Sequence, residues 1–203
     1  MVVEQVTIKS QSGWLKKTLW ISLIVFVILL ILVGVFLAGI FMNKPKKNIT
    51  ITNPLTDIIF SNTNQAGQTN RQAVIDQAVL EFNESYINYL LVALGAGHLH
   101  KSIIYGNPVI EFSLDQDTWN AEIKGSDLVT QRGTTDKKDL SISISKQDAV
   151  EAILSNDIEQ FMRDLVSKDR IQMEMIASKL ELGSKGYLAM YKEVTGEDAP
   201  IEE

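Results

Sequence analysis

Residues 110–131 read IEFSLDQDTWNAEIKGSDLVTQ, and this stretch decides the expected fold. Apolar and polar residues alternate over residues 110–114 and again over residues 119–124. Alternation with a period of two is typical of strands that have one buried face and one wet face. The turns at Asp115-Gln116-Asp117 and Gly125-Ser126 are short, so the sequence predicts an antiparallel meander whose third strand is Asp127 to Gln131.

Downstream of the meander, the sequence predicts a fourth strand and two helices. Leu140 to Ser145 alternates strictly between Leu or Ile and Ser, which indicates the strand. Ser145 with Asp148 three residues later resembles a capping box, and it predicts a helix over Lys146 to Leu154. Residues 158–166 place apolar side chains at i, i+3, i+4, i+7 and i+8, which is the stripe of a second helix.

The remaining elements of the expected domain flank this region. Arg71 to Leu94 is predicted as one long helix that ends at the glycines after it. Ile171 to Met175 alternates as a fifth strand, and Tyr187 to Val194 forms a closing helix. We therefore expect a folded domain over residues 71–195, followed by a frayed acidic tail over residues 196–203.

Residues 19–42, LWISLIVFVILLILVGVFLAGIFM, contain no charged side chain. A helix of this length reaches roughly 36 Å, enough to cross a hydrocarbon core of about 30 Å. The run exceeds the apolar core of a cleavable signal peptide, which is about 7 to 15 residues. The sequence therefore predicts a retained single-pass anchor, preceded by a tail over residues 1–18. Residues 48–70 are rich in Asn, Thr and Gln. We expect residues 43–70 to be a flexible polar linker, of which about 23 residues span roughly 25 Å.

The charge balance differs on the two sides of this anchor. Residues 1–47 hold six Lys and one Glu, which leaves 13 of the 19 basic and 24 of the 25 acidic residues for the rest of the chain, a net charge of −11. Nucleic-acid binding requires clustered Lys and Arg, so we expect no nucleic-acid partner. Because the chain has no cysteine, disulfides, thiol catalysis and cysteine-ligated metals are excluded.

Residues that could support catalysis or metal binding are few. His98 and His100 form a His-x-His pair, but no third ligand is implied by spacing, so no metal site is predicted. Two histidines, no cysteine and no Gly-x-Ser-x-Gly elbow offer little for a nucleophilic triad. The carboxylate pairs Asp115 with Asp117, Asp136 with Asp139, and Asp164 with Asp169 fall where turns or solvated faces are expected. The sequence therefore predicts no catalytic residue, no cofactor and no enzyme activity.

The order of these elements has a counterpart among known families. The residues that carry the likeness are Val109 to Asp115, Asp117-Thr118-Trp119 with its strand, Gly125-Ser126, Leu140 to Asp148, and Gly186-Tyr187-Leu188. Over residues 71–195 the chain resembles the SCP-2 sterol carrier domain family. The resemblance implies an α+β fold in which helices cover a five-stranded, largely antiparallel sheet around an apolar cavity for a lipid, fatty acyl chain or sterol.

The chain departs from this family pattern in two ways. Ser155-Asn156-Asp157 and Lys168-Asp169-Arg170 stand where members often have glycine, so the shape of the pocket is expected to differ. The anchor is the second departure, since members usually occur as soluble proteins or as tails of larger enzymes.

The cavity candidates are large apolar residues on the expected inward faces of the strands and helices. Methionines among them suit irregular apolar ligands, and lipid pockets need apolar walls. The alternative is that the same residues simply fill a core. The candidates are Phe112, Trp119, Phe161, Met162, Leu165, Met173, Met175, Leu188 and Tyr191.

These observations lead to two functional hypotheses. The first is a membrane-anchored domain that binds or transfers an apolar molecule taken from its own bilayer. The second is a non-catalytic interaction or scaffold module on the same fold, with its protein partner unspecified. Asn48-Ile49-Thr50 and Asn83-Glu84-Ser85 match the N-glycosylation pattern and favour an extracytoplasmic domain, whereas three Lys on each side of the span leave its orientation open.

Overall fold

The computed structural model describes residues 20, 22–34 and 46–199 of a chain that divides into two compact units, residues 1–42 and 43–203. In the first unit, residues 20 and 22–34 are helical, and every one of these side chains is exposed. The other residues of the predicted span over 19–42, and the tail over 1–18, lie outside the described residues. Within the described ranges, no helix is both long enough and apolar enough to cross a membrane.

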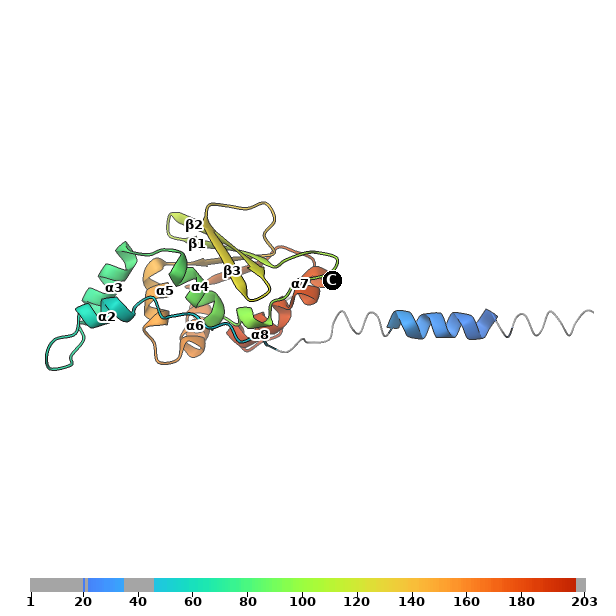
Figure 1. Cartoon of the computed structure of the whole chain (residues 1–203), viewed down its shortest axis with the longest axis horizontal. Coiled ribbons are helices and arrows are strands. Elements are labelled where there is room, and N and C mark those ends of the chain that lie inside the picture. The colour runs from blue at the N-terminus through green and yellow to red at the C-terminus, as the bar shows by residue number, and fades with distance from the viewer. Residues whose placement is uncertain (1–19, 21, 35–45, 200–203) are drawn as a thin grey trace, which may run out of the picture. The chain divides into compact units, whose positions relative to one another are not determined.

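A five-stranded sheet forms the centre of the second unit (Figure 1). Its strands lie in the order β3-β2-β1-β4-β5. The β1–β2, β2–β3 and β4–β5 pairs are antiparallel, whereas β1 and β4 are parallel. The predicted meander and the five-stranded, largely antiparallel sheet are thus confirmed. The strands are β1 Val109–Leu114, β2 Asp117–Lys124, β3 Asp127–Arg132, β4 Leu140–Ile144 and β5 Gln172–Met175.

One face of the sheet carries a row of apolar side chains that runs across four neighbouring strands, from β2 to β5. Phe112 pairs with Trp119 on one side and with Ile142 on the other, and Ile142 in turn pairs with Met173. Phe112 and Ile142 are fully buried. This row confirms the alternation that the sequence predicts, because each apolar position of one strand meets an apolar position of the next.

The opposite face is polar, and residues 133–139 shield part of it from solvent. The chain leaves β3 and passes β2 and β1 before it enters β4, and residues 133–139 make this crossing. Asn120 donates to the carbonyl of Gly133 (2.8 Å), and Glu111 accepts from the backbone of Thr135 (3.1 Å) and from Lys138 Nζ (2.5 Å). Glu111 is therefore buried on a face that would otherwise meet solvent.

Helices cover the apolar face of the sheet (Figure 1). The predicted cap of α5 is confirmed, because Ser145 Oγ accepts from the backbone N–H of Asp148 at 3.0 Å. The apolar stripe predicted at residues 158–166 becomes α6. The helices of the second unit are α2 Thr56–Ser61, α3 Arg71–Leu80, α4 Glu84–Ala93, the 3₁₀ turn η1 Ala96–His98, α5 Lys146–Ile153, α6 Ile158–Ser167, α7 Lys179–Lys185 and α8 Tyr187–Thr195.

The predicted single helix over Arg71 to Leu94 is wrong. The chain breaks between α3 and α4, where Asn83 caps α4 by accepting from the backbone N–H of Ser85 at 2.9 Å. An Asn side chain competes with the helical backbone for hydrogen bonds, which favours a new helix start at this position. Helix α7 was not predicted, because its seven residues include Gly183 and are too few to display a helical period.

Residues 46–70 belong to the folded unit, which corrects the predicted linker over 43–70. Leu55 and Ile58 are buried, and α2 packs against α3. Asn62 Nδ2 donates to Gln77 Oε1 (2.9 Å), and Asn70 Oδ1 caps α3 by accepting from Ala73 (3.2 Å). The Asn-rich composition that resembles a disordered tether instead supplies turns and caps, and two buried aliphatic side chains attach the segment to the helix next to it.

Candidate functional site

The structure divides the nine cavity candidates into two groups. Four lie inside the core with almost no exposed surface: Phe112, Trp119, Met162 and Leu165. The other five are only partly buried: Phe161, Met173, Met175, Leu188 and Tyr191. We call these five residues the apolar seam.

The apolar seam comes from three elements, α6, β5 and α8. Helices α6 and α8 contact each other, and β5 follows α6 after a short turn in which the backbone N–H of Arg170 bonds to Leu165 (3.0 Å). Met173 pairs with Ile142 of β4, and β5 is the edge strand of the sheet formed by the described residues. The edge position leaves Met173 and Met175 with partial exposure, whereas inward side chains of β1 and β4 are sealed.

A second feature, which sequence reasoning missed, is a polar hollow of about 630 Å³ at the end of the sheet where β1 and β4 begin. Its walls come from the turn before β1, the 133–139 crossing, the segment after β5, and α7. We call it the polar hollow. It is lined by Tyr105, Gly106, Asn107, Val109, Asn120, Glu122, Gln131, Thr135, Asp136, Lys137, Lys138, Asp139, Ile176, Ala177, Glu181 and Lys185.

A buried ion pair lies in the wall of the polar hollow. Lys185 Nζ is 2.6 Å from Asp139 Oδ1, and each side chain has only 3% of its surface exposed. Lys185 also donates to Glu181 Oε1 at 2.8 Å. The second oxygen of Asp139 accepts from Tyr187 Oη (3.0 Å) and from the backbone N–H of Val109 (2.7 Å). Both charges are therefore satisfied by several partners, as burial requires.

Burial dominates the electrostatics of this cluster. Desolvation raises the pKa of Asp139 above its usual value, although the hydrogen bond from Lys185 acts in the opposite direction. Desolvation also raises the pKa of Tyr187 well above its usual value, and the nearby charge of Asp139 adds to that rise. Tyr187 therefore remains a neutral donor to a carboxylate at neutral pH.

Local backbone geometry brings these groups together. Asp139 directly precedes β4, and its carbonyl accepts from the backbone N–H groups of Ile176 and Ala177 after β5 (2.9 and 3.1 Å). Gly186 adopts a left-handed conformation (φ 91°) between Lys185 and Tyr187, and a Cβ there would lie 2.2 Å from the carbonyl of His98. Only glycine fits such a position, so the chain can turn from α7 into α8 and direct both side chains at Asp139.

The expectation that Asp139 lies at a solvated turn is wrong. The residue joins the starts of β1 and β4, the end of β5 and the α7–α8 junction through the contacts above. No sequence signal separates Asp139 from the neighbouring Asp136, which is exposed. Only the crossing of residues 133–139 over the sheet and the placement of α7 decide which of the two is buried.

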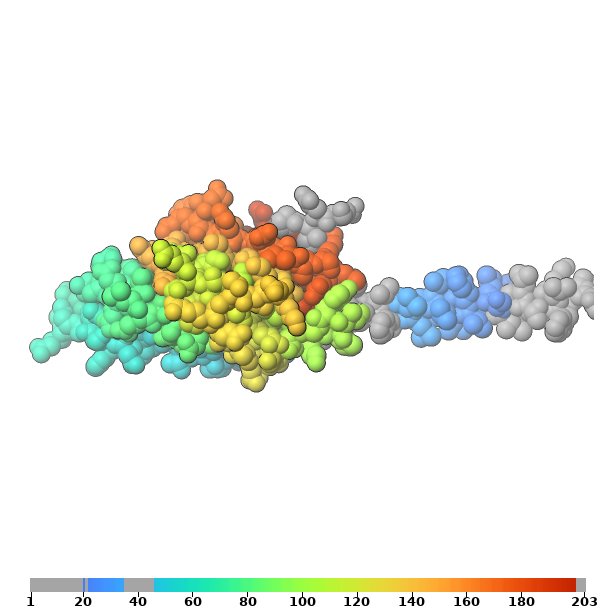
Figure 2. All heavy atoms as spheres, turned by 90° about the horizontal axis from the view of Figure 1, so that it is seen from above, coloured from blue at the N-terminus to red at the C-terminus, as the bar shows by residue number. Residues whose placement is uncertain are grey.

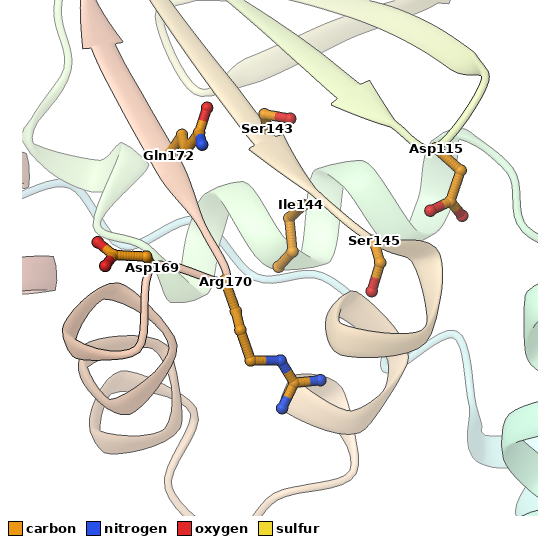
Figure 3. Close-up of a pocket in the computed structure, with 7 residues that line it drawn as sticks. All are labelled: Asp115, Ser143, Ile144, Ser145, Asp169, Arg170 and Gln172. Carbon is orange, nitrogen blue, oxygen red and sulfur yellow. The ribbon is translucent and has the colours of Figure 1, made fainter.

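At the opposite end of the sheet lies a smaller hollow of about 230 Å³ (Figure 3). Asp115 and Asp169 line opposite sides of it, so these carboxylates do not converge on one point. Arg170 points between α5 and α6 and pairs with the buried carboxylate of Asp148. The arrangement therefore offers no carboxylate pair.

The two histidines of the His-x-His pair do not form a shared site. His98 Nε2 is 2.5 Å from Glu193 Oε2, and Lys46 binds the other oxygen of Glu193. Burial alone would raise the pKa of Glu193, but the hydrogen bonds from Lys46 and His98 outweigh it and lower the pKa. His100 is buried, and its backbone N–H donates to the carbonyl of Lys185 at 3.0 Å. Within the described part of the chain, no group of three or more His, Asp or Glu side chains could hold a metal ion.

Comparison with known proteins adds no relative: no protein-family model and no curated protein matches this chain.

Proposed function

We propose that residues 43–203 form an SCP-2-like domain that binds an apolar molecule, such as a lipid, a fatty acyl chain or a sterol-like compound. In this proposal residues 19–42 anchor the chain in a membrane. The observation that carries it is the apolar seam, where five large apolar side chains of α6, β5 and α8 stay partly exposed.

The chemistry of the seam favours an apolar ligand over a polar one. Two of its members are methionines on an edge strand, and an unbranched thioether side chain adapts to ligands of irregular shape. Each methylene that such a ligand buries contributes about 0.8 kcal/mol. The polar hollow is a poor alternative for this ligand class, since charged side chains of both signs line it.

The overall architecture also supports the proposal. A five-stranded, largely antiparallel sheet with helices over its apolar face is the arrangement that the resemblance to the SCP-2 family implies. The seam residues come from the edge strand β5 and from α6 and α8, two helices that contact each other.

The anchor in the proposal is supported by the first unit. Residues 22–34 are helical, and their large apolar side chains are 44–62% exposed. A continuous apolar surface of this kind is costly in water, and lipid would cover it. A bilayer at this point would also supply the apolar ligand.

Photolabelling of the full chain in phosphatidylcholine vesicles with a diazirine fatty acid tests the proposal. Trypsin should release residues 171–179, which contain both seam methionines, and residues 186–192, which contain Leu188 and Tyr191. We expect saturable label on both peptides. Label confined to the first unit, or label that does not saturate, would contradict ligand binding in the seam.

A filling variant sharpens this test. Met173→Trp should occupy the seam without adding charge and should reduce the label on residues 186–192 several-fold. Leu80→Trp is the matched control, because Leu80 is 87% exposed on α3. An unlabelled seam together with one stoichiometric protein partner from solubilised membranes would favour the scaffold function instead.

A further inference from the structure

Two aliphatic side chains project from a tight turn of the domain. Ile103 and Ile104 are 94% and 65% exposed. The turn that carries them is closed by two backbone hydrogen bonds between Ser102 and Gly106, of 2.8 and 3.1 Å. Turns usually present polar residues to water, so a rigid turn with two exposed isoleucines at its tip points to an apolar contact.

Helix α7 extends this apolar surface. Ser184 donates to Ser102 Oγ at 3.1 Å, which fixes the turn against the helix. Leu180 lies one helical turn before Ser184, so both side chains share a face of α7, and Leu180 is 48% exposed. In Figure 2 the lime segment that contains the turn lies at the same end of the domain as the orange-red α7. We call Ile103, Ile104 and Leu180 the apolar tip.

Exposed lysines border the apolar tip. Lys101 comes two residues before Ile103, and Lys179 is adjacent to Leu180. Aliphatic side chains surrounded by lysine are typical of a surface that meets the headgroup region of a bilayer, where the apolar groups insert and the ammonium groups meet phosphate.

The chain enters the domain against η1, which precedes the tip by a few residues in the sequence. The backbone N–H of Lys47 donates to the carbonyl of Gly97 at 2.8 Å, and Lys46 pairs with Glu193. A Cβ at Gly97 would lie 2.5 Å from the carbonyl oxygen of Lys47, so the entering segment lies directly against η1. After η1 the chain passes the end of α7, where the backbone N–H of His100 donates to the carbonyl of Lys185 (3.0 Å), and then reaches Ser102.

The length of the remaining connection limits how far this end of the domain can lie from a membrane. Four residue steps from Met42 to Lys46 span at most about 14 Å. We propose that the apolar tip docks on the bilayer that holds the chain, with Ile103 and Ile104 inserted at the boundary between headgroups and acyl chains. The inference rests on the anchor in the proposed function, because only a span over residues 19–42 brings Lys46 this close to lipid.

Depth-dependent quenching tests the docking. The chain has no cysteine, so Ile104→Cys in the full chain can carry a single environment-sensitive fluorophore. The protein is reconstituted in vesicles of phosphatidylcholine and phosphatidylglycerol, with or without doxyl-labelled lipid. We expect doxyl lipid to reduce emission at position 104 by about twofold or more, as for a group at the interface. Leu80→Cys, at another exposed aliphatic position, should keep its emission.

The two proposals fail in different ways. Protein that leaves the vesicles in alkaline carbonate would contradict the anchor and therefore the proposed function. Protein that stays in the vesicles while position 104 remains unquenched would overturn the docking alone. Equal quenching at positions 104 and 80 would also overturn it, because the contact would then not be specific to the apolar tip.

Discussion

The apolar seam and the polar hollow are built on the same sheet in opposite ways. The seam consists of side chains that are partly buried, uncharged and adaptable, on an edge strand and two helices. The ion pair of the hollow is almost completely buried, and each charge has several partners at 2.6–3.0 Å. This difference agrees with the proposal that the seam binds a ligand. The buried ion pair beside the hollow instead links the starts of β1 and β4 to the α7–α8 junction.

The hollow also explains why a charged pair is retained inside the domain. A buried ion pair gains little net stability over apolar residues of similar volume, but loss of one partner leaves an uncompensated charge. Here the pair also fixes the junction of α7 and α8 against the start of β4, because Tyr187 and Lys185 share Asp139. Such a junction must be rigid if α8 is to keep its side of the seam in place.

The largest predicted effect is a loss of stability when the buried ion pair beside the hollow is broken. Lys185→Met should lower the free energy of unfolding by about 3–5 kcal/mol, since it leaves Asp139 buried without its cation. Urea denaturation of the full chain in micelles, followed by circular dichroism, measures the loss. Lys179→Met, at an exposed lysine of the same helix, should change it little. Equal stability of the two variants would show that the pair is not structural.

Identical substitutions in core and seam provide the next test. Met162→Ala should cost about 2–5 kcal/mol because Met162 is 1% exposed in the core. Met175→Ala should cost clearly less, since its side chain is partly buried and the edge strand can relax. Urea midpoints of the two variants give the comparison. If Met175→Ala costs as much as Met162→Ala, the seam is ordinary core.

The helix caps on the two sides offer a smaller, paired test. Ser178 caps α7, which leads to the hollow, and Asp157 caps α6, which carries Phe161 of the seam. Replacement of either by Ala should cost about 1 kcal/mol. Only Asp157→Ala should also reduce fatty-acid labelling of residues 171–179. If both variants reduce that label equally, the seam and the hollow are not separable.

The smallest expected effect is on the dependence of stability on pH. Burial raises the pKa of Asp139, so its contribution to stability is fully present below the unfolded pKa near 3.8 and is lost as the pH rises through the folded value. The pKa of Glu193 is lowered, so its contribution is present above the unfolded pKa near 4.5 and is lost as the pH falls through the folded value.

Urea midpoints between about pH 3 and pH 6 separate these two contributions. Glu193→Gln should remove the loss of stability at acidic pH. Asp139→Asn should remove the decline in stability as the pH rises. Unchanged slopes in both variants would contradict the assigned protonation equilibria.

Prediction from sequence succeeded where the signal is local. The alternation over residues 110–124 and 140–144 located the three strands β1, β2 and β4, and Ser145 with Asp148 located the start of α5. It failed where a short polar motif interrupts a local pattern. Asn83 divides the expected long helix, and residues 46–70 pack on the domain through only a few apolar side chains.

The sequence by itself determined the five strands and the helices α5, α6 and α8, the absence of cysteine chemistry and the apolar character of residues 19–42. These follow from periodicity and composition, which are properties of neighbouring residues. Only the tertiary structure decided that Asp139 is buried while Asp136 is exposed, and that Met175 is accessible while Met162 is sealed. The reason is physical, because burial depends on partners far away in the chain. Lys185 is such a partner for Asp139, whereas β5 lies at the edge of the described sheet, where only β4 pairs with it.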